Sequence, residues 1–130
     1  ITPLLSLTTL DWLDLRGNQI SDVTPLAALT NLTGLTLEFN QISDITPLAA
    51  LTKLTRLGLK FNLIQDITPL LSLTNLTQLT LDYTHLSQES LKFHVPTLQS
   101  TAFVDNGLRW PDGVHGNIRR RRTNRPQCRI

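Results

Sequence analysis

Residues 24–54 decide the fold: they read TPLAALTNLTGLTLEFNQISDITPLAALTKL, so that the opening TPLAALT returns after 22 positions. The same step relates leucine, asparagine, aspartate and proline positions on both sides of this stretch. The clearest sets are Leu13, Leu35, Leu57 and Leu79; Asn18, Asn40 and Asn62; Asp22, Asp44 and Asp66; and Pro3, Pro25, Pro47 and Pro69. Self-similarity at a fixed period of this length indicates stacked copies of one supersecondary unit.

Each unit contains signals for a strand, a turn and a short helix. The alternation Leu13-Asp14-Leu15 predicts a strand whose leucines face inward. The asparagine that follows can satisfy backbone groups inside a turn, and stacked copies would form a ladder. The Thr-Pro pair then resembles a helix start, with Thr as N-cap and Pro at the first helical position. We expect strands near 12–16, 34–38, 56–60 and 78–82, and short helices near 25–29, 47–51 and 69–73.

One such unit cannot bury its leucines alone, so neighbouring units must stack. The predicted fold class is therefore α/β: a right-handed solenoid with a parallel concave β-sheet and short convex helices or 3-10 turns. The unit, LxxLxLxxNxIxD[IV]TPLxxLTx, is the leucine-rich repeat pattern, and residues 1 to about 86 resemble the 22-residue repeats of the internalin class of bacterial leucine-rich repeat proteins.

The resemblance implies a non-catalytic protein–protein interaction module that binds a protein partner on the concave face of the sheet. It also implies a secreted or cell-surface protein. Two alternatives stay open from the sequence. The repeats could instead position a separate catalytic or surface-anchoring domain of a longer protein, or belong to an intracellular, phosphatase-regulator-type repeat protein.

The repeat pattern divides the chain into three parts. Residues 1–86 hold four repeats, the first entered in mid-repeat. Residues 87–108 read as a C-terminal cap, with Ser87 as the N-cap of a helix, a kink expected at Pro96 and a last edge strand near 102–104. Residues 109–130 carry seven Arg and one Asp, a balance of +6 against −4 for residues 1–108, and read as an unstructured basic tail.

The first repeat predicts an open N-terminal end, since an uncapped solenoid exposes apolar core. We expect a missing strand or cap before Ile1. The chain is expected to be a monomer or, alternatively, to self-associate through the uncapped N-terminal end.

Function is expected at the outward positions of the strands, because the fold does not dictate them. Equivalent positions of successive repeats form a column across the sheet. In one column the sign of the charge alternates: Arg16, Glu38, Lys60 and Asp82. This alternation predicts a salt-bridge ladder or, alternatively, partner recognition. The next column holds Gly17, Phe39, Phe61 and Tyr83, and another holds Trp12, Gly34, Arg56 and Gln78. Exposed aromatics and Arg are typical of protein-binding surfaces, so the candidate partner-binding residues are Trp12, Phe39, Arg56, Phe61 and Tyr83. The alternative is that the rings only pack on one another or on the rim of the sheet.

The sequence offers no catalytic, cofactor or metal motif. His85, His94 and His115 share no metal spacing, Cys128 is the single cysteine, and neither GxGxxG nor GxxxxGK[ST] occurs. We therefore expect no enzyme activity and no cofactor. The Arg119–Arg122 run lacks an aromatic platform or a groove-reading helix, so nucleic acid binding is not expected. No apolar run is long enough to span a bilayer.

Overall fold

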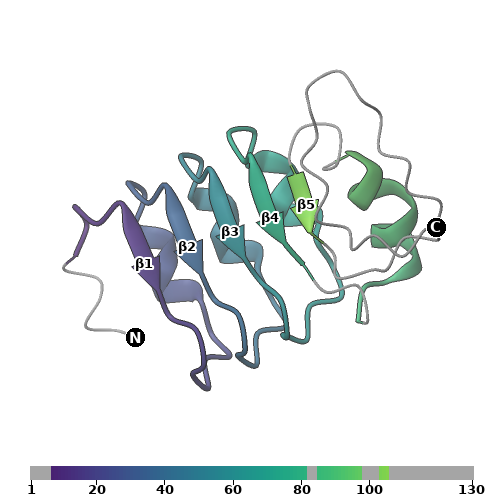
Figure 1. Ribbon diagram of the computed structural model, residues 1–130, viewed down its shortest axis with the longest axis horizontal. Coiled ribbons are helices and arrows are strands. Elements are labelled where there is room, and N and C mark those ends of the chain that lie inside the picture. Colours follow the sequence, from purple (N-terminus) through teal and green to yellow (C-terminus); the bar gives the residue numbers. More distant parts are fainter. Residues whose placement is uncertain (1–6, 82–84, 98–102, 106–130) are drawn as a thin grey trace.

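The computed structural model describes residues 7–81, 85–97 and 103–105. Its elements follow one another as three-residue strands and five-residue helical turns. They are β1 (Trp12–Asp14), η2 (Thr24–Ala28), β2 (Gly34–Thr36), η3 (Thr46–Ala50), β3 (Arg56–Gly58), η4 (Thr68–Ser72), β4 (Gln78–Thr80), η5 (Ser90–His94) and β5 (Phe103–Asp105). The strands stand side by side in one sheet, and the 3-10 helices η2, η3 and η4 form a second layer behind it (Figure 1).

All strand pairs are parallel, in the order β1-β2-β3-β4-β5. Each residue of β1 to β3 pairs with the residue 22 positions later, so that Leu13, Leu35 and Leu57 lie in register. The predicted parallel solenoid is thereby confirmed. The strands are two residues shorter than expected at their carboxyl ends. Backbone bonds nevertheless continue past β1, from the Leu15 amide to the Thr36 carbonyl at 2.8 Å.

The inward leucines, isoleucines and valines form one apolar core between the sheet and the 3-10 helices. In the second repeat Leu32, Leu35 and Leu37 are at most 1% exposed. Complete burial of such a side chain stabilises a fold by roughly 1.5–3 kcal/mol relative to leaving it exposed. The core thins in the first repeat, where Leu13 and Leu15 are only partly buried. The repeats therefore hold together by contacts with their neighbours, as the stacking argument requires.

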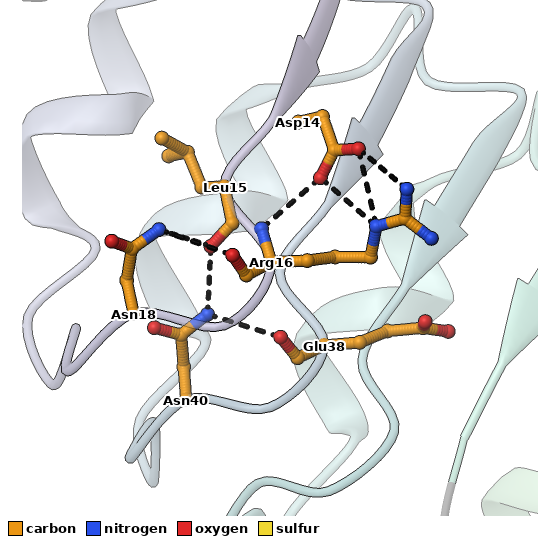
Figure 2. A network of polar contacts seen from close by, with 6 residues as sticks. All are labelled: Asp14, Leu15, Arg16, Asn18, Glu38 and Asn40. Atoms are coloured by element: carbon orange, nitrogen blue, oxygen red, sulfur yellow. Dashed lines mark hydrogen bonds and ion pairs between the residues drawn. The ribbon is translucent and has the colours of Figure 1, made fainter.

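The predicted asparagine ladder is present from the first to the third repeat. Asn40 is buried, its Nδ2 donates to the carbonyls of Leu15 and Leu37, and its Oδ1 accepts the Ile20 amide at 3.0 Å. Figure 2 shows the Nδ2 atom reaching back to the preceding repeat. Asn62 repeats these contacts one unit further on. The side-chain amide thus links adjacent repeats as well as satisfying its own turn.

The predicted Thr N-cap of the short helices is wrong, because the N-cap position falls on the preceding residue and the aspartate two residues before Thr accepts the Thr amide. Asp22, Asp44 and Asp66 each accept the amide of the following Thr with Oδ1, at 2.8–2.9 Å. The Thr68 hydroxyl and amide both donate to Asp66 and lower the pKa of that carboxyl. The hydroxyl and amide of Thr24 lower the pKa of Asp22 in the same way, and those of Thr46 lower the pKa of Asp44. The regular aspartate column is therefore a structural feature of the turn.

A helical segment follows the fourth repeat. Ser87 caps it as predicted, its Oγ accepting the Ser90 amide at 3.2 Å. The middle of the segment, η5, is a π-helix, and α-helical geometry resumes at residues 95–97, so that Pro96 does not end the helix. Val95 is completely buried, and Ser90 Oγ accepts the Ile67 amide at 3.3 Å. The segment therefore covers the η4 side of the core.

Several predictions fall on residues beyond those that the structure describes. They concern Asp82, Tyr83, His115, Cys128, the Arg119–Arg122 run and the 109–130 tail.

Candidate partner-binding surface

Phe39 and Phe61 lie in the turns that follow β2 and β3. Their rings stack, with centroids 4.4 Å apart and an angle of 17° between the planes. The two residues are nonetheless 55% and 54% exposed. The rings thus pack on one another, as one of the two sequence readings expected, while more than half of each residue remains accessible to a partner.

The backbone at this column is left-handed. Phe39 and Phe61 have φ angles of 58° and 57°, and Gly17, their equivalent in the first repeat, has 69°. The turn geometry is the same in successive repeats, since the amides of Gly17 and Phe39 each donate to the next repeat at 3.0 Å. Glycine adopts this conformation freely, whereas other residues incur about 1–2 kcal/mol. The fold therefore favours glycine here, and the phenyl rings are present in spite of the local backbone preference.

Trp12 and Arg56 belong to a different part of the surface. They lie in the first position of β1 and β3, in register with Gly34 between them. This position precedes that of Phe39 and Phe61 by five residues in each repeat. Trp12 is 48% exposed, and its ring covers Gly34, where any Cβ would overlap it. The structure thus separates the candidate residues into a stacked pair at the turns and a Trp-Gly-Arg row at the strand starts; Tyr83 is not among the described residues.

The predicted salt-bridge ladder does not form between Arg16 and Glu38. Arg16 instead donates from Nη2 to Asp14 at 2.8 Å, within the same strand end, and this bond is the first cause of the lowered Asp14 pKa (Figure 2). The Glu38 carboxylate accepts the Thr80 hydroxyl two strands away, passing over Gly58. Asp14 and Arg16 are two residues apart along the strand, so their side chains lie on the same face and can pair.

Leu63 is an exposed apolar residue that the sequence reading missed. It is 50% exposed and follows the buried Asn62, two positions after Phe61. The equivalent positions in the two earlier repeats are Gln19 and Gln41. The sequence does contain a signal for it, namely a leucine at a repeat position that holds glutamine in the two earlier repeats. Leu63 therefore adds an exposed apolar side chain two positions after Phe61.

Two further kinds of feature, a metal cluster and a membrane-spanning helix, are absent from the described residues. Among them, no three His, Cys, Asp or Glu side chains converge in a way that could hold a metal ion. In the same part of the chain no helix has the length and apolarity to cross a bilayer.

Comparison with known proteins agrees with this architecture. A family model described as leucine-rich repeats (two copies) matches residues 8–50. None of the curated proteins compared is significantly similar to the chain. Among solved structures, an internalin (inlF) of Listeria monocytogenes is 37% identical over 82% of this chain and 30% of its own, with a TM-score of 0.71.

Two further structures are comparably similar. Internalin C2 of Listeria monocytogenes is 42% identical over 80% of this chain and 43% of its own, with a TM-score of 0.69. A leucine-rich repeat protein of Leptospira interrogans is 27% identical over 81% of this chain and 27% of its own, with a TM-score of 0.70. The chain thus spans less than half the length of each. Its period, its parallel sheet and these neighbours together show that the chain is a leucine-rich repeat protein with internalin-like 22-residue repeats.

Proposed function

We propose that the chain is a non-catalytic protein-interaction module whose partner binds around Phe39, Phe61 and Tyr83, with Trp12 and Arg56 as further contacts. Leucine-rich repeat proteins are typically protein-interaction scaffolds. The observation that carries the choice of surface is the stacked, half-exposed Phe39–Phe61 pair in left-handed turns. Residues held in an unfavourable backbone conformation are concentrated at functional sites.

Stacking alone does not account for phenylalanine at positions 39 and 61. An aromatic pair adds about 0.5–1.5 kcal/mol beyond its buried area, which offsets only part of two left-handed backbone penalties. Replacement of both phenylalanines by glycine should therefore reduce the stability of the fold only slightly. A partner that covers the exposed parts of both residues would remove this apolar surface from water, which favours binding. Buried aromatic side chains are typical binding hot spots.

The test is a quantitative pull-down from the source cell and from candidate host cells. The wild-type chain is compared with Phe39→Ala/Phe61→Ala/Tyr83→Ala and with Phe93→Ala as a matched control. Phe93 is a similarly exposed phenylalanine at 59%, but it lies on η5, away from the turns. We expect the triple variant to lose at least one partner that the wild type and the control retain. Retention of every partner by a folded triple variant refutes the proposed surface.

A second candidate function is favoured by the lengths of the similar structures, because the chain spans only 27% to 43% of them. In that case the repeats position a separate catalytic or surface-anchoring domain. Reading the gene on both sides of this segment distinguishes the two. An adjoining catalytic or anchoring domain, together with no partner for the isolated repeats, favours the second candidate.

A further inference from the structure

The Trp12 side chain extends from its own strand to the next one. Its ring atoms Cε3 and Cζ3 occupy the space in which a side chain of Gly34 would begin. Gly34 is the residue of β2 in register with Trp12, and it is buried, whereas Trp12 is 48% exposed. The indole therefore bridges β1 and β2, and its exposed part is available to a partner.

Arg56 is the next residue of the Trp-Gly-Arg row. It is exposed, and it is in register with Gly34 on the neighbouring strand β3. Adjacent strands lie about 4.8 Å apart, so the backbone of Arg56 is one strand spacing from the glycine that the indole covers. An exposed aromatic ring and an exposed arginine are thus neighbours on the outward face of the sheet.

The Arg56 guanidinium forms no ion pair with a carboxylate in the described part of the chain. Glu38, which follows β2, directs its carboxylate to the Thr80 hydroxyl on β4. Asp11 belongs to the first repeat, so its backbone is two strand spacings, about 9.6 Å, from that of Arg56. Arg56 is therefore a positive charge that an acidic group of a partner can pair with.

We propose that the Trp-Gly-Arg row binds an acidic side chain of a protein partner at Arg56, with an apolar side chain of the same partner segment against the Trp12 ring. The inference rests on the proposed function and specifies the chemistry of the partner at this part of the surface. A carboxylate suits Arg56, because a guanidinium can donate two parallel N–H···O bonds to it. An apolar side chain suits the indole, since covering the exposed ring removes apolar surface from water.

The two partner side chains fit alternate residues of an extended segment. Residues i and i+2 of such a segment point to the same side and lie about 6.6 Å apart. The row offers a ring above Gly34 and, one strand spacing further on, the long side chain of Arg56, which can adjust to this distance. The partner segment crosses the strands of the sheet, because Trp12, Gly34 and Arg56 follow one another from strand to strand.

The peptide Ac-Phe-Gly-Glu-NH2 carries this pattern and serves as the probe. Ac-Phe-Gly-Gln-NH2 is the neutral control of similar shape, and Ac-Ala-Gly-Glu-NH2 lacks the apolar ring. The full chain is titrated with each peptide, and the Trp12 indole N–H and Arg56 Nε–H signals are followed by nuclear magnetic resonance. We expect the Glu probe to bind with a dissociation constant about three- to tenfold lower than that of either control. Equal dissociation constants for the probe and the Gln peptide, or no saturable shift of these signals with the probe, overturn the proposal.

Variants of the chain show whether Arg56 itself selects the acidic peptide. Arg56→Gln should make the Glu and Gln peptides bind equally, whereas Arg56→Lys keeps the charge without the paired donors and should retain part of the difference. Lys53→Gln is the matched control, because it removes a positive charge from an exposed side chain of the same repeat. It should leave the preference unchanged. A preference that persists in Arg56→Gln, or that Lys53→Gln abolishes to the same extent, overturns the proposal.

The Trp-Gly-Arg row and the proposed function fail in different ways. If the Phe39→Ala/Phe61→Ala/Tyr83→Ala variant loses partners while the peptides show no dependence on Arg56, the proposed function stands and the role of the row is refuted. If Arg56 selects the acidic peptide but that variant retains every partner, the role of the row stands and the proposed surface around the stacked pair is refuted.

Discussion

Asn40 and Asn62, which belong to successive repeats, donate to the same acceptor: the carbonyl oxygen of Leu37 receives an Nδ2–H from each at 2.9 Å. Asn40 reaches this oxygen within its own turn, and Asn62 reaches it from the next repeat. Each asparagine also accepts an amide of the preceding repeat, Ile20 or Ile42. The repeats are therefore connected on this side by a continuous chain of hydrogen bonds that includes side chains of only one residue type.

Replacement of Asn40 by alanine should reduce the free energy of unfolding by about 1–3 kcal/mol, because the Ile20 amide and inward carbonyls lose their partner. Gln41→Ala should change it by less than about 0.5 kcal/mol, since Gln41 is exposed. The measurement is the urea midpoint of both variants. Equal midpoints would show that the buried amide does not stabilise the turn.

Acid should weaken the fold through the aspartates that accept the Thr amides. The pKa values of Asp22, Asp44 and Asp66 are lowered in the folded chain, so the stabilisation is present above their unfolded pKa of about 3.9 and is lost as the pH falls through the folded value. Asparagine at all three positions keeps the acceptor oxygen but does not titrate. We expect the urea midpoint of this variant to fall less steeply below about pH 4 than that of the wild type. Identical pH profiles would contradict the assignment.

Gly34→Ala should displace the Trp12 ring, because the new Cβ would occupy the space of that ring. In a Trp110→Phe background, where Trp12 is the remaining tryptophan and is excited selectively, the fluorescence maximum should move to longer wavelength. Stability should fall by about 1–3 kcal/mol from the overpacking. Gly58→Ala is the control, since its nearest neighbour, Thr36 Cγ2, would be 3.1 Å away and can shift. A matching spectral change in the control would refute the Trp12–Gly34 contact.

The helical segment after the fourth repeat should contribute to stability through Val95. This side chain is completely buried, so we expect Val95→Ala to cost about 2 kcal/mol through lost burial and the cavity left behind. Phe93→Ala removes a larger but exposed side chain of the same segment and should cost less than about 0.5 kcal/mol. Thermal or denaturant unfolding of the two variants gives the comparison, and a costlier Phe93 change would contradict the observed burial.

The sequence by itself determined the repeat, the parallel register and the inward leucines, because a period of 22 places equivalent residues side by side in any stacked arrangement. It also determined the role of Asn40, since a buried turn must satisfy its backbone groups. These features depend only on local pattern and on repetition, both of which can be read along the chain.

Tertiary structure alone decided which outward side chains meet. Asp14 rather than Glu38 pairs with Arg16, and Asp22 accepts the amide of Thr24 at the start of η2. These choices depend on rotamers and on turn geometry that the one-letter pattern does not contain. The left-handed backbone at Phe39 is likewise invisible in the sequence, because phenylalanine gives no sign of a positive φ. The surroundings of the glycines also differ, since the Trp12 ring covers Gly34 and the Thr36 and Glu38 side chains lie beside Gly58, whereas the Cβ direction of Gly17 is open. Which side chain a neighbouring repeat places beside each glycine is not given by the period.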